Sequence, residues 1–278
     1  MTNPIIAIIG GTGEMGQWFK RYFERNNHKV IISSRKTEIK PIDAAKQADV
    51  VIISVPINVT EDVIKQVGPY VREDALLMDF TSIKIQPVEA MLKYSKSEVI
   101  GTHPVFGPSV DSLKNQTVVI CPARGEKWLP WLKKILRKGE AKLKISTAEY
   151  HDKMMSVIQG MIHFSSIVAC HTLGDMGIDI NDSQKFSSPI YKLRLDVMGR
   201  ILNQDPSLYA DIEMLNPNTL KVLDSYIDAA KKLREIILNK DKSAFEHFFK
   251  EAADHLGDFK EEAEEYSDYL IRKLVRKE

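Results

Sequence analysis

The chain of 278 residues is longer than the roughly 100–200 residues of one domain, so two domains are expected. Its 39 Lys and Arg residues nearly balance its 38 Asp and Glu residues, and the net charge of +1 lacks the basic excess typical of proteins that grip nucleic acid or an anionic membrane surface. These values argue against a nucleic-acid partner and favour a small-molecule ligand.

The first residues and the cysteines indicate a cytoplasmic protein. The start of the chain runs directly into the apolar segment Ile5–Ile9, without the basic region and cleavage site of a signal peptide. Apolar runs stay short of the ~18 residues that a membrane span requires, and Val50–Val55 stops at Pro56. Cys121 and Cys170 lie far apart, which argues against a disulfide framework or a structural zinc site. We therefore expect no membrane span and no bound metal.

From residue 5 to about residue 145, short runs of β-branched residues alternate with helix-like stretches. The runs are apolar throughout, as in parallel strands that helices cover on both faces. They predict strands at Ile5–Ile9, Lys29–Ser33, Val50–Val55, Leu76–Asp79, Val99–Thr102, Thr117–Cys121 and Lys142–Ile145. The predicted fold class is α/β, with a Rossmann-type, doubly wound and mostly parallel sheet in a first domain of residues 1–145.

After Ser146 the strand signals stop and helical periodicity continues. It is interrupted at Gly177, Ser187-Ser188-Pro189, Asp205-Pro206 and Asn216-Pro217-Asn218. Ser188 followed by Pro189 is typical of a helix N-cap and first turn, so a helix to about Asn203 is expected. An amphipathic helix near the end is predicted to bury one stripe, in the core or in a dimer contact: Phe245, Phe248, Phe249, Ala252, His255 and Leu256. We expect an all-helical second domain, residues 146–278.

A glycine-rich turn follows the first predicted strand. The sequence from Gly11 through Thr12, Gly13, Glu14 and Met15 to Gly16 has the spacing G-x-G-x-x-G and leads into a helix. Gly11 suits a tight turn, Gly13 lets backbone N–H groups approach a pyrophosphate, and Gly16 allows the helix to pack closely on the strand. Because strand, glycines and helix occur in this order, the motif predicts a dinucleotide-binding domain and not merely a tight turn.

The second predicted strand ends with Ser33, Ser34 and Arg35, where NAD-binding domains usually carry an acidic residue against the ribose 2′-hydroxyl. Two hydroxyls and a cation suit a 2′-phosphate, which a carboxylate would repel. NADP is therefore favoured, with NAD as one alternative and a merely structural basic turn as another. After the third strand, Val55 and Pro56 are expected to line the adenosine side, unless the proline only ends the strand.

Ser82 and His103 follow the fourth and fifth predicted strands. Both therefore belong to the carboxyl edge of the sheet, where ligands of such folds bind. A neutral imidazole can draw off the proton of a hydroxyl group during hydride transfer. A single histidine at a strand end is more often structural, so these residues alone leave the role of His103 open.

Between Gly101 and Asp211 the sequence resembles the prephenate dehydrogenases, especially the enterobacterial kind that is fused to a chorismate mutase. The similar segments, in chain order, are His103–Pro108, Ala148–Asp152, Ile158–Phe164, Ser187–Leu193, Met198–Arg200, Gln204–Pro206 and Leu208–Asp211. The resemblance implies oxidative decarboxylation of prephenate to 4-hydroxyphenylpyruvate in tyrosine biosynthesis. It also implies a homodimer formed through the helical domain, and an active site in the cleft between the two domains.

The resemblance further implies roles for individual residues. The histidine that matches His103 accepts a hydrogen bond from the C4 hydroxyl of the substrate ring, and the serine that matches Ser82 assists it. Arg200 matches an arginine that binds a substrate carboxylate. Lys192 stands where the family has a second arginine and offers only a point charge, so a solvated lysine is an equal alternative.

Gln159 and His163 are four residues apart on one predicted helix, and by resemblance their shared face meets the substrate side chain. The neutral Gln159 favours the keto acid prephenate over arogenate, whose ammonium group would attract an acidic partner. His151 and Asp152 are either a further contact or a capping or core pair.

Other functions stay open from the sequence. An arogenate dehydrogenase would carry the same motifs. The glycine turn with Ser33–Arg35 also resembles reductases that pass hydride between NADP and a deazaflavin, although that similarity ends near residue 60. A non-enzymatic NADP-sensing module would not need His103, Ser82 and Arg200 to converge. Other hydroxy-acid dehydrogenases of this build usually rely on a lysine base in the helical half.

Overall fold

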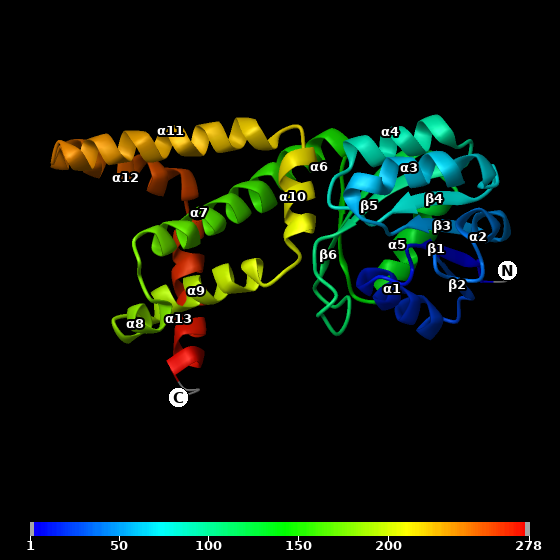
Figure 1. Ribbon diagram of the computed structural model, residues 1–278, viewed down its shortest axis with the longest axis horizontal. Helices are drawn as coiled ribbons and strands as arrows, with labels where there is room; N and C mark the ends of the chain where they lie inside the picture. The colour runs from blue at the N-terminus through cyan, green and yellow to red at the C-terminus, as the bar shows by residue number, and fades with distance from the viewer. Residues whose placement is uncertain (1–2, 276–278) are drawn as a thin grey trace. The chain divides into compact units, whose positions relative to one another are not determined.

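The computed structural model describes residues 3–275, which divide into two compact units (Figure 1). The first unit consists of the residues up to Ile158 together with Ala210–Asn218. The second consists of Gln159–Tyr209 together with the residues from Thr219 onward. A short segment of the helical half of the sequence therefore belongs to the first unit.

The first unit is built on a seven-stranded sheet in the order β2-β1-β3-β4-β5-β6-β7. The strands are β1 (Ile6–Ile9), β2 (Val30–Ser33), β3 (Val50–Ile53), β4 (Leu76–Asp79), β5 (Glu98–Pro104), β6 (Thr117–Arg124) and β7 (Lys142–Ile145). Each lies where an apolar run predicts it. All neighbouring strands are parallel except β5 and β6, in which His103 lies opposite Val119. The predicted fold class, a mostly parallel Rossmann-type sheet, is confirmed.

Two strands differ from the expectation of parallel strands covered on both faces. β6 runs antiparallel to β5, because residues 105–116 join them by a loop without the crossover helix of a parallel pair. β7 is an edge strand, and its Lys142 and Lys144 side chains are exposed. Lysines on an edge strand oppose its pairing with another sheet.

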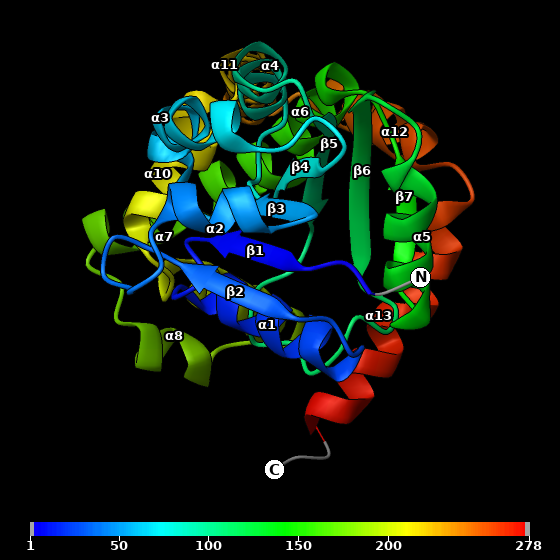
Figure 2. The ribbon, with the colours of Figure 1, turned by 90° about the vertical axis from the view of Figure 1, so that its right-hand side faces the viewer.

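Helices cover both faces of the sheet (Figure 2). On one face lie α1 (Glu14–Arg25) and α5 (Trp128–Lys138), and on the other lie α2 (Pro41–Gln47), α3 (Ile57–Val67) and α4 (Ile85–Tyr94). Successive strand residues point to opposite faces, so Ile8 packs in the cluster of Phe19 and Ile9 packs in the cluster of Ile64. This double covering explains why the central strands β1 and β3 are apolar throughout, and it leaves the carboxyl edge of the sheet for polar side chains.

The boundary of the first unit differs from the domain boundary predicted at residue 145. α6 (Ala148–Met155) and most of α10 (Pro206–Leu215) belong to the first unit. The cause is a set of long-range hydrogen bonds. The Asp152 carboxylate accepts the backbone N–H groups of Lys84 and Ile85, and the Asn216 amide donates to the backbone carbonyl of Asp152.

The second unit is helical throughout its described residues, as predicted. Its helices are α7 (Ile162–Asp175), α8 (Ile180–Lys185), α9 (Pro189–Leu202), α11 (Thr219–Leu238), α12 (Lys242–Leu256) and α13 (Phe259–Val275). A π-helical turn, Ser156–Met161, joins α6 to α7. Gly177, with a φ of 65°, follows α7, and the Ser188 hydroxyl accepts the backbone N–H of Tyr191 to cap α9. The breaks that the sequence predicts at these positions are therefore present.

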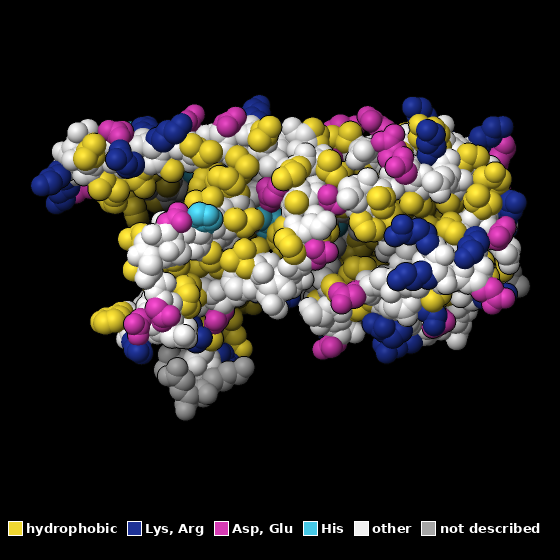
Figure 3. All heavy atoms as spheres, viewed as in Figure 1, with side chains coloured by type: hydrophobic (Ala, Val, Ile, Leu, Met, Phe, Trp, Pro, Cys, Tyr) yellow, Lys and Arg dark blue, Asp and Glu magenta, His cyan; other side chains and the backbone are white. Residues whose placement is uncertain are grey.

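Large apolar side chains of the second unit remain exposed (Figure 3). On α12, where a buried stripe was expected, Phe245 is 41% exposed, Phe249 65% and Leu256 51%. The chain itself therefore does not bury this stripe. Of the two alternatives given by the sequence, this exposure favours the dimer contact, which stays a prediction.

One continuous helical stretch, Ala148–Asp175, is long and apolar enough to cross a membrane by length and composition. This corrects the expectation that no segment reaches that length. Gln159, His163 and Ser166 interrupt its apolar runs but leave its average composition apolar. Only 22% of its apolar window is buried within the chain. A helix that packs on other protein surfaces has the same composition, so this property alone does not indicate a membrane.

Candidate active site

The glycine-rich turn connects β1 to α1. Gly10 adopts a left-handed conformation (φ = 84°), so the strained position of the turn falls one residue before Gly11. A Cβ atom on Gly16 would lie 2.7 Å from the Cα atom of Gly11, which explains a glycine where the helix meets the turn. The three glycines thus hold α1 tightly against the end of β1.

The N-terminus of α1 is exposed, and no side chain caps it within the described part of the chain. Gly13 is the N-cap residue, and it is exposed together with Thr12 and Glu14, while Met15 is half-buried. The first N–H groups of a helix lack partners within the helix, and the aligned peptide dipoles favour an anion there. The turn therefore fits the pyrophosphate of a dinucleotide.

The turn after β2 presents only part of the group predicted to bind a 2′-phosphate. Ser33 is buried, and its hydroxyl donates to the backbone carbonyl of Ile39 at 2.7 Å. Ser34 is half-buried, its hydroxyl accepts the backbone N–H of Lys36 at 3.2 Å, and Arg35 is exposed. Ser33 therefore shapes the turn, while Ser34 and Arg35 lie where a ribose phosphate can reach them.

Val55 and Pro56 follow β3 beside the glycine turn. A Cβ atom on Gly10 would lie 2.8 Å from the Val55 side chain, so the two segments are in contact. Pro56 is exposed and forms the N-cap of α3. Pro56 therefore separates the end of β3 from the start of α3, beside the segment that contacts the dinucleotide turn. Contact with adenosine stays a prediction.

His103 lies near the end of β5 and is 2% exposed. Burial lowers its pKa well below the ordinary value, and the neighbouring His151 and Lys84 lower it further. The imidazole is therefore neutral at physiological pH, which is the state that can accept a proton. This environment supports the role of a base more strongly than the sequence position alone.

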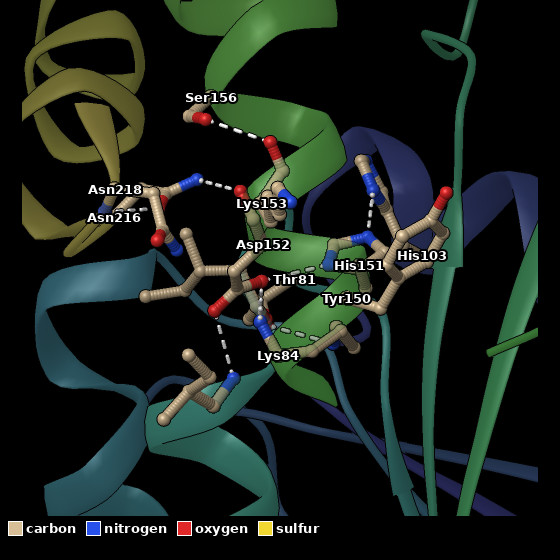
Figure 4. Close-up of polar contacts among 12 residues, drawn as sticks. Thr81, Lys84, His103, Tyr150, His151, Asp152, Lys153, Ser156, Asn216 and Asn218 are labelled. Carbon is tan, nitrogen blue, oxygen red and sulfur yellow. Dashed lines mark hydrogen bonds and ion pairs between the residues drawn. The ribbon is translucent and has the colours of Figure 1, made fainter. Parts of the chain in front are cut away.

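His151 and Asp152 connect to His103 in a line of buried side chains (Figure 4). The Nδ1 atom of His103 lies 2.9 Å from Nε2 of His151, and Nδ1 of His151 lies 2.7 Å from Oδ1 of Asp152. Burial lowers the pKa of His151, although the hydrogen bond with Asp152 opposes that effect. The sequence left a contact and a capping role open for this pair. The structure shows the capping and core role, because both residues are buried and Asp152 also caps α4, while a contact with the substrate stays a prediction.

A buried ion pair between Lys84 and Asp79 was not foreseen from the sequence. Both side chains are fully buried, and the Lys84 Nζ also contacts the Thr81 hydroxyl at 3.1 Å. Asp79 accepts the backbone N–H groups of Thr81 at 3.0 Å and Thr102 at 3.1 Å. A carboxylate at the end of an apolar strand was the available signal, since buried charges are nearly always paired.

Ser82 lies half-buried in the loop between β4 and α4. The Thr102 hydroxyl donates to the backbone carbonyl of Asp79, which joins the ends of β4 and β5. Ser82 and His103 therefore follow or end adjacent strands, as predicted. No hydrogen bond joins their side chains within residues 3–275, so assistance of His103 by Ser82 stays a prediction.

Arg200 and His163 are close to the same tyrosine in the second unit. The rings of His163 and Tyr209 are 4.5 Å apart between centroids. Burial raises the pKa of Tyr209, and the positive charge of Arg200 partly opposes that rise. Arg200 itself is exposed on α9. The second unit thus gathers a cation, an imidazole and a phenol.

Gln159 and Lys192, the other predicted substrate residues, have different environments. Gln159 lies in the π-helical turn, so the α-helical spacing that placed it on one face with His163 does not apply there. Its Oε1 atom is buried and has no hydrogen-bond partner among the described residues. The Lys192 ammonium lies 3.4 Å from the Asp196 carboxylate on the same helix, and both are partly exposed. This pairing favours the solvated alternative for Lys192.

A Rossmann-type sheet, an uncapped helix N-terminus after a glycine turn, and a neutral histidine at the carboxyl edge define a dehydrogenase that uses a nicotinamide dinucleotide. Residues 24–145 match the nucleotide-binding domain of prephenate dehydrogenase, and residues 147–251 match the prephenate dehydrogenase dimerization domain.

The chain is 43% identical to the "Probable arogenate/prephenate dehydrogenase" of Methanocaldococcus jannaschii, over 99% of this chain and 66% of that protein. It is 34% identical to the T-protein of Haemophilus influenzae, over 96% of this chain and 71% of that protein. The solved structure of Aquifex aeolicus prephenate dehydrogenase with hydroxyphenyl propionate and NAD+ superposes with a TM-score of 0.74 at 21% identity, covering 92% of this chain and 97% of that one.

The chain belongs to the prephenate dehydrogenase family. It is therefore an oxidoreductase of a family of prephenate and arogenate dehydrogenases that serves tyrosine biosynthesis, and its residues 24–145 match that family's nucleotide-binding domain. These matches confirm that the chain belongs to the family that its sequence motifs resemble. The chain spans 66% of the length of the Methanocaldococcus relative.

Proposed function

We propose that the chain is a prephenate dehydrogenase, which converts prephenate to 4-hydroxyphenylpyruvate and carbon dioxide. The observation that carries this proposal is the buried, neutral His103 at the carboxyl edge of the dinucleotide-binding sheet. Oxidation of a ring alcohol requires a group that takes up the hydroxyl proton, and a neutral imidazole can do so. His103 has the required protonation state and lies on the edge of the sheet where such folds bind ligands.

The reaction balances without a further reactant. The glycine turn would hold the pyrophosphate of a nicotinamide dinucleotide, which would supply a hydride acceptor for ring carbon C4. As the C4–H bond breaks, His103 accepts the hydroxyl proton, and the bond between ring carbon C1 and its carboxylate breaks to release carbon dioxide. The electron pair of that bond makes the ring aromatic, and His103 returns the proton to the phenol oxygen. The chain therefore supplies position and a reversible proton acceptor.

The two carboxylates of prephenate need cations or oriented donors. We assign one of them to Arg200, whose planar guanidinium can form two parallel hydrogen bonds with a carboxylate. Gln159 and His163 are proposed to contact the substrate side chain. The unpartnered Oε1 of Gln159 supports this assignment, since a buried amide normally has a partner. Lys192 contributes at most a distant charge because Asp196 accompanies it.

NADP is our proposed cofactor, with Ser34 and Arg35 contacting the 2′-phosphate. The exposed Arg35 and the Ser34 turn support this choice. Ser33 does not take part, since its hydroxyl is occupied by Ile39. NAD, which is bound in the Aquifex aeolicus structure, is the alternative.

We also propose that the chain forms a homodimer through its helical unit. The match of residues 147–251 to a dimerization domain supports this proposal, as do the exposed phenylalanines of α12. Exposed apolar surface of this extent usually marks a contact between subunits. The apolar helix Ala148–Asp175 is consistent with the same contact.

Arogenate dehydrogenase is the second candidate, and the name of the Methanocaldococcus relative includes it. Arogenate carries an ammonium group where prephenate has a keto group, so an acidic partner would be expected near the side chain. Gln159 is neutral, which favours prephenate.

The test is an absorbance assay of reduced nicotinamide with prephenate or arogenate and with NADP or NAD, in all four pairings. Turnover with prephenate and NADP is expected. Activity with NAD alone would remove the role of Ser34 and Arg35 but keep the reaction. Activity with arogenate alone would reverse the substrate choice. Absence of turnover in all four pairings would favour deazaflavin reduction or a non-enzymatic NADP sensor.

A further inference from the structure

Three buried side chains, Asp152, His151 and His103, form a continuous hydrogen-bonded line within the first unit (Figure 4). His151 and Asp152 are at most 1% exposed as side chains, and His103 is 2% exposed. α6 supplies His151 and Asp152, and β5 supplies His103. Water is therefore excluded from the two hydrogen bonds of the line, and the atoms that form them must satisfy one another.

The hydrogen-bond partners of Asp152 determine where the protons of both histidines lie. A carboxylate accepts hydrogen bonds and donates none, and Asp152 already accepts the backbone N–H groups of Lys84 at 2.7 Å and Ile85 at 2.9 Å. Nδ1 of His151 must therefore carry a proton to bond with Asp152. The neutral His151 then has a bare Nε2, which can only accept. His103 must in turn donate from Nδ1, which leaves its Nε2 as a free proton acceptor.

We propose that His151 and Asp152 are positioning residues that hold His103 in the Nδ1–H tautomer, with Nε2 presented as the base. This assignment rests on the proposed function of His103. His151 is the residue that acts directly on His103, and Asp152 acts through His151. The chain thus uses two buried groups to fix which nitrogen of one histidine is basic, as carboxylate–histidine pairs do in many active sites.

The same line also stabilises His103 while it holds the proton. Protonation at Nε2 makes the Nδ1–H group a stronger donor to Nε2 of His151, because a charged donor forms stronger hydrogen bonds. The charged neighbours oppose one another: Lys84 disfavours a positive charge on either histidine, while Asp152 and Asp79 favour one on His151. His103 is therefore neutral at rest, and its existing hydrogen bond with His151 becomes stronger when it is protonated.

Nitrogen-15 NMR of the wild-type protein, without substrate, tests the tautomers directly. The chemical shift of each ring nitrogen reports whether it carries a proton. We expect both His103 and His151 to be protonated at Nδ1 and bare at Nε2 near neutral pH. A proton on Nε2 of His103 would overturn the proposal. This result does not depend on turnover, so an inactive protein with these tautomers would contradict the proposed reaction and leave the positioning role intact.

Variants of His151 test the consequence for catalysis. A glutamine side chain can place an amide oxygen near the position of the imidazole Nε2, so His151→Gln should keep an acceptor for His103. Leucine removes the acceptor. We expect His151→Leu to lower kcat by about 10²-fold with KM for prephenate changed less than about threefold, and His151→Gln to recover about tenfold of that loss.

His28→Gln provides the matched control, because His28 is a buried histidine of the same unit whose Nδ1 contacts the Pro4 carbonyl, outside the proposed site. Its kcat is expected to be unchanged. Equal kcat values for His151→Leu and His151→Gln would contradict positioning through a hydrogen bond. A higher KM with an unchanged kcat would contradict it as well. In His151→Leu, NMR should show that His103 is no longer restricted to the Nδ1–H tautomer.

Discussion

The carboxylate of Asp152 accepts the backbone N–H of Lys84 at 2.7 Å, although the two residues are 68 positions apart. The same oxygen lies 2.7 Å from Nδ1 of His151. One side chain therefore ties the beginning of α4 to the pair of histidines. Substitutions of residues near Asp152 are therefore expected to change both the stability of the protein and its catalytic activity. Measurements of unfolding and of kinetics separate the two effects.

Replacement of His103 by asparagine tests the proposed base. Asparagine keeps a similar size and one hydrogen bond but cannot take up a proton. We expect kcat with prephenate to fall by roughly 10²–10⁴-fold, with the dissociation constant of prephenate nearly unchanged. Rapid kinetics and equilibrium binding would measure the two quantities. A parallel loss of binding would show that His103 holds the substrate instead of acting as the base.

The low pKa of His103 and His151 predicts how stability depends on pH. Burial lowers both values in the folded protein, whereas the unfolded chain protonates histidine near pH ~6.5. The unfolded state therefore binds more protons below that pH, so the free energy of unfolding should decrease as the pH falls below about 6.5. Above that pH, the two neutral histidines should make their full contribution to the free energy of unfolding. Urea unfolding at a series of pH values would measure the trend. An equally steep dependence in His103→Asn would exclude His103 as a contributor.

Arg200→Gln tests the carboxylate clamp. The interaction with a carboxylate exists before and during the reaction, so its loss should raise KM for prephenate by about 10–100-fold and change kcat little. Arg194→Gln, another exposed arginine of α9, serves as the control and should leave KM unchanged. Similar values for both variants would remove Arg200 from the substrate site.

Lys84→Met tests the buried ion pair. Methionine leaves the Asp79 carboxylate buried without its cation, so the free energy of unfolding should decrease by about 3–5 kcal/mol. Lys84→Met combined with Asp79→Asn removes both charges and should be less destabilised than the single variant. Denaturant unfolding would compare them. A double variant that is less stable than Lys84→Met would show that the Asp79 carboxylate stabilises the strand ends without Lys84.

Phe249→Glu tests the helical contact between subunits. Phe249 is 65% exposed on α12, and a charge within a buried apolar interface is costly. We expect the dissociation constant of the dimer to rise about 30-fold or more, as for an aromatic hot spot. Sedimentation velocity would measure it. Tyr70→Glu, at an exposed aromatic residue of the first unit, should leave the association unchanged. A monomeric wild-type protein would contradict the proposed dimer.

Local sequence patterns were sufficient to predict the strands of the sheet and the positions at which helices are interrupted. Strand Leu76–Asp79 matches the predicted bounds, because an unalternated apolar run suits a strand that helices cover on both faces. Lys142–Ile145 also matches, although its two lysines are exposed at the edge of the sheet. The Ser188-Pro189 signal likewise marks the start of α9. The antiparallel β6 was missed, since its own residues do not reveal the direction of its neighbour.

The site could be predicted only in part. His103 was found by its place at a strand end and by resemblance, but its link to His151 spans 48 positions and has no local signature. The burial of Lys84 was unexpected because lysine is rarely buried without a partner, and that partner becomes evident only when β4 and the following loop fold together. Ser33 was predicted to contact the cofactor phosphate, because the sequence does not reveal that its hydroxyl turns inward and donates to the backbone carbonyl of Ile39.

The division of the first unit between two stretches of chain bears on its synthesis. Segment 210–218 supplies Asn216, which donates to the backbone of Asp152, and this segment begins 65 positions after the last strand ends at residue 145 (210 − 145). A nascent chain that has emerged up to residue 145 holds all seven strands but lacks the cap of α4 and the partner of His103. Domains usually fold as they leave the ribosome, from the N-terminus onward. All seven strands are therefore synthesised before His151 and Asp152, and Asn216 follows Asp152 after a further 64 residues.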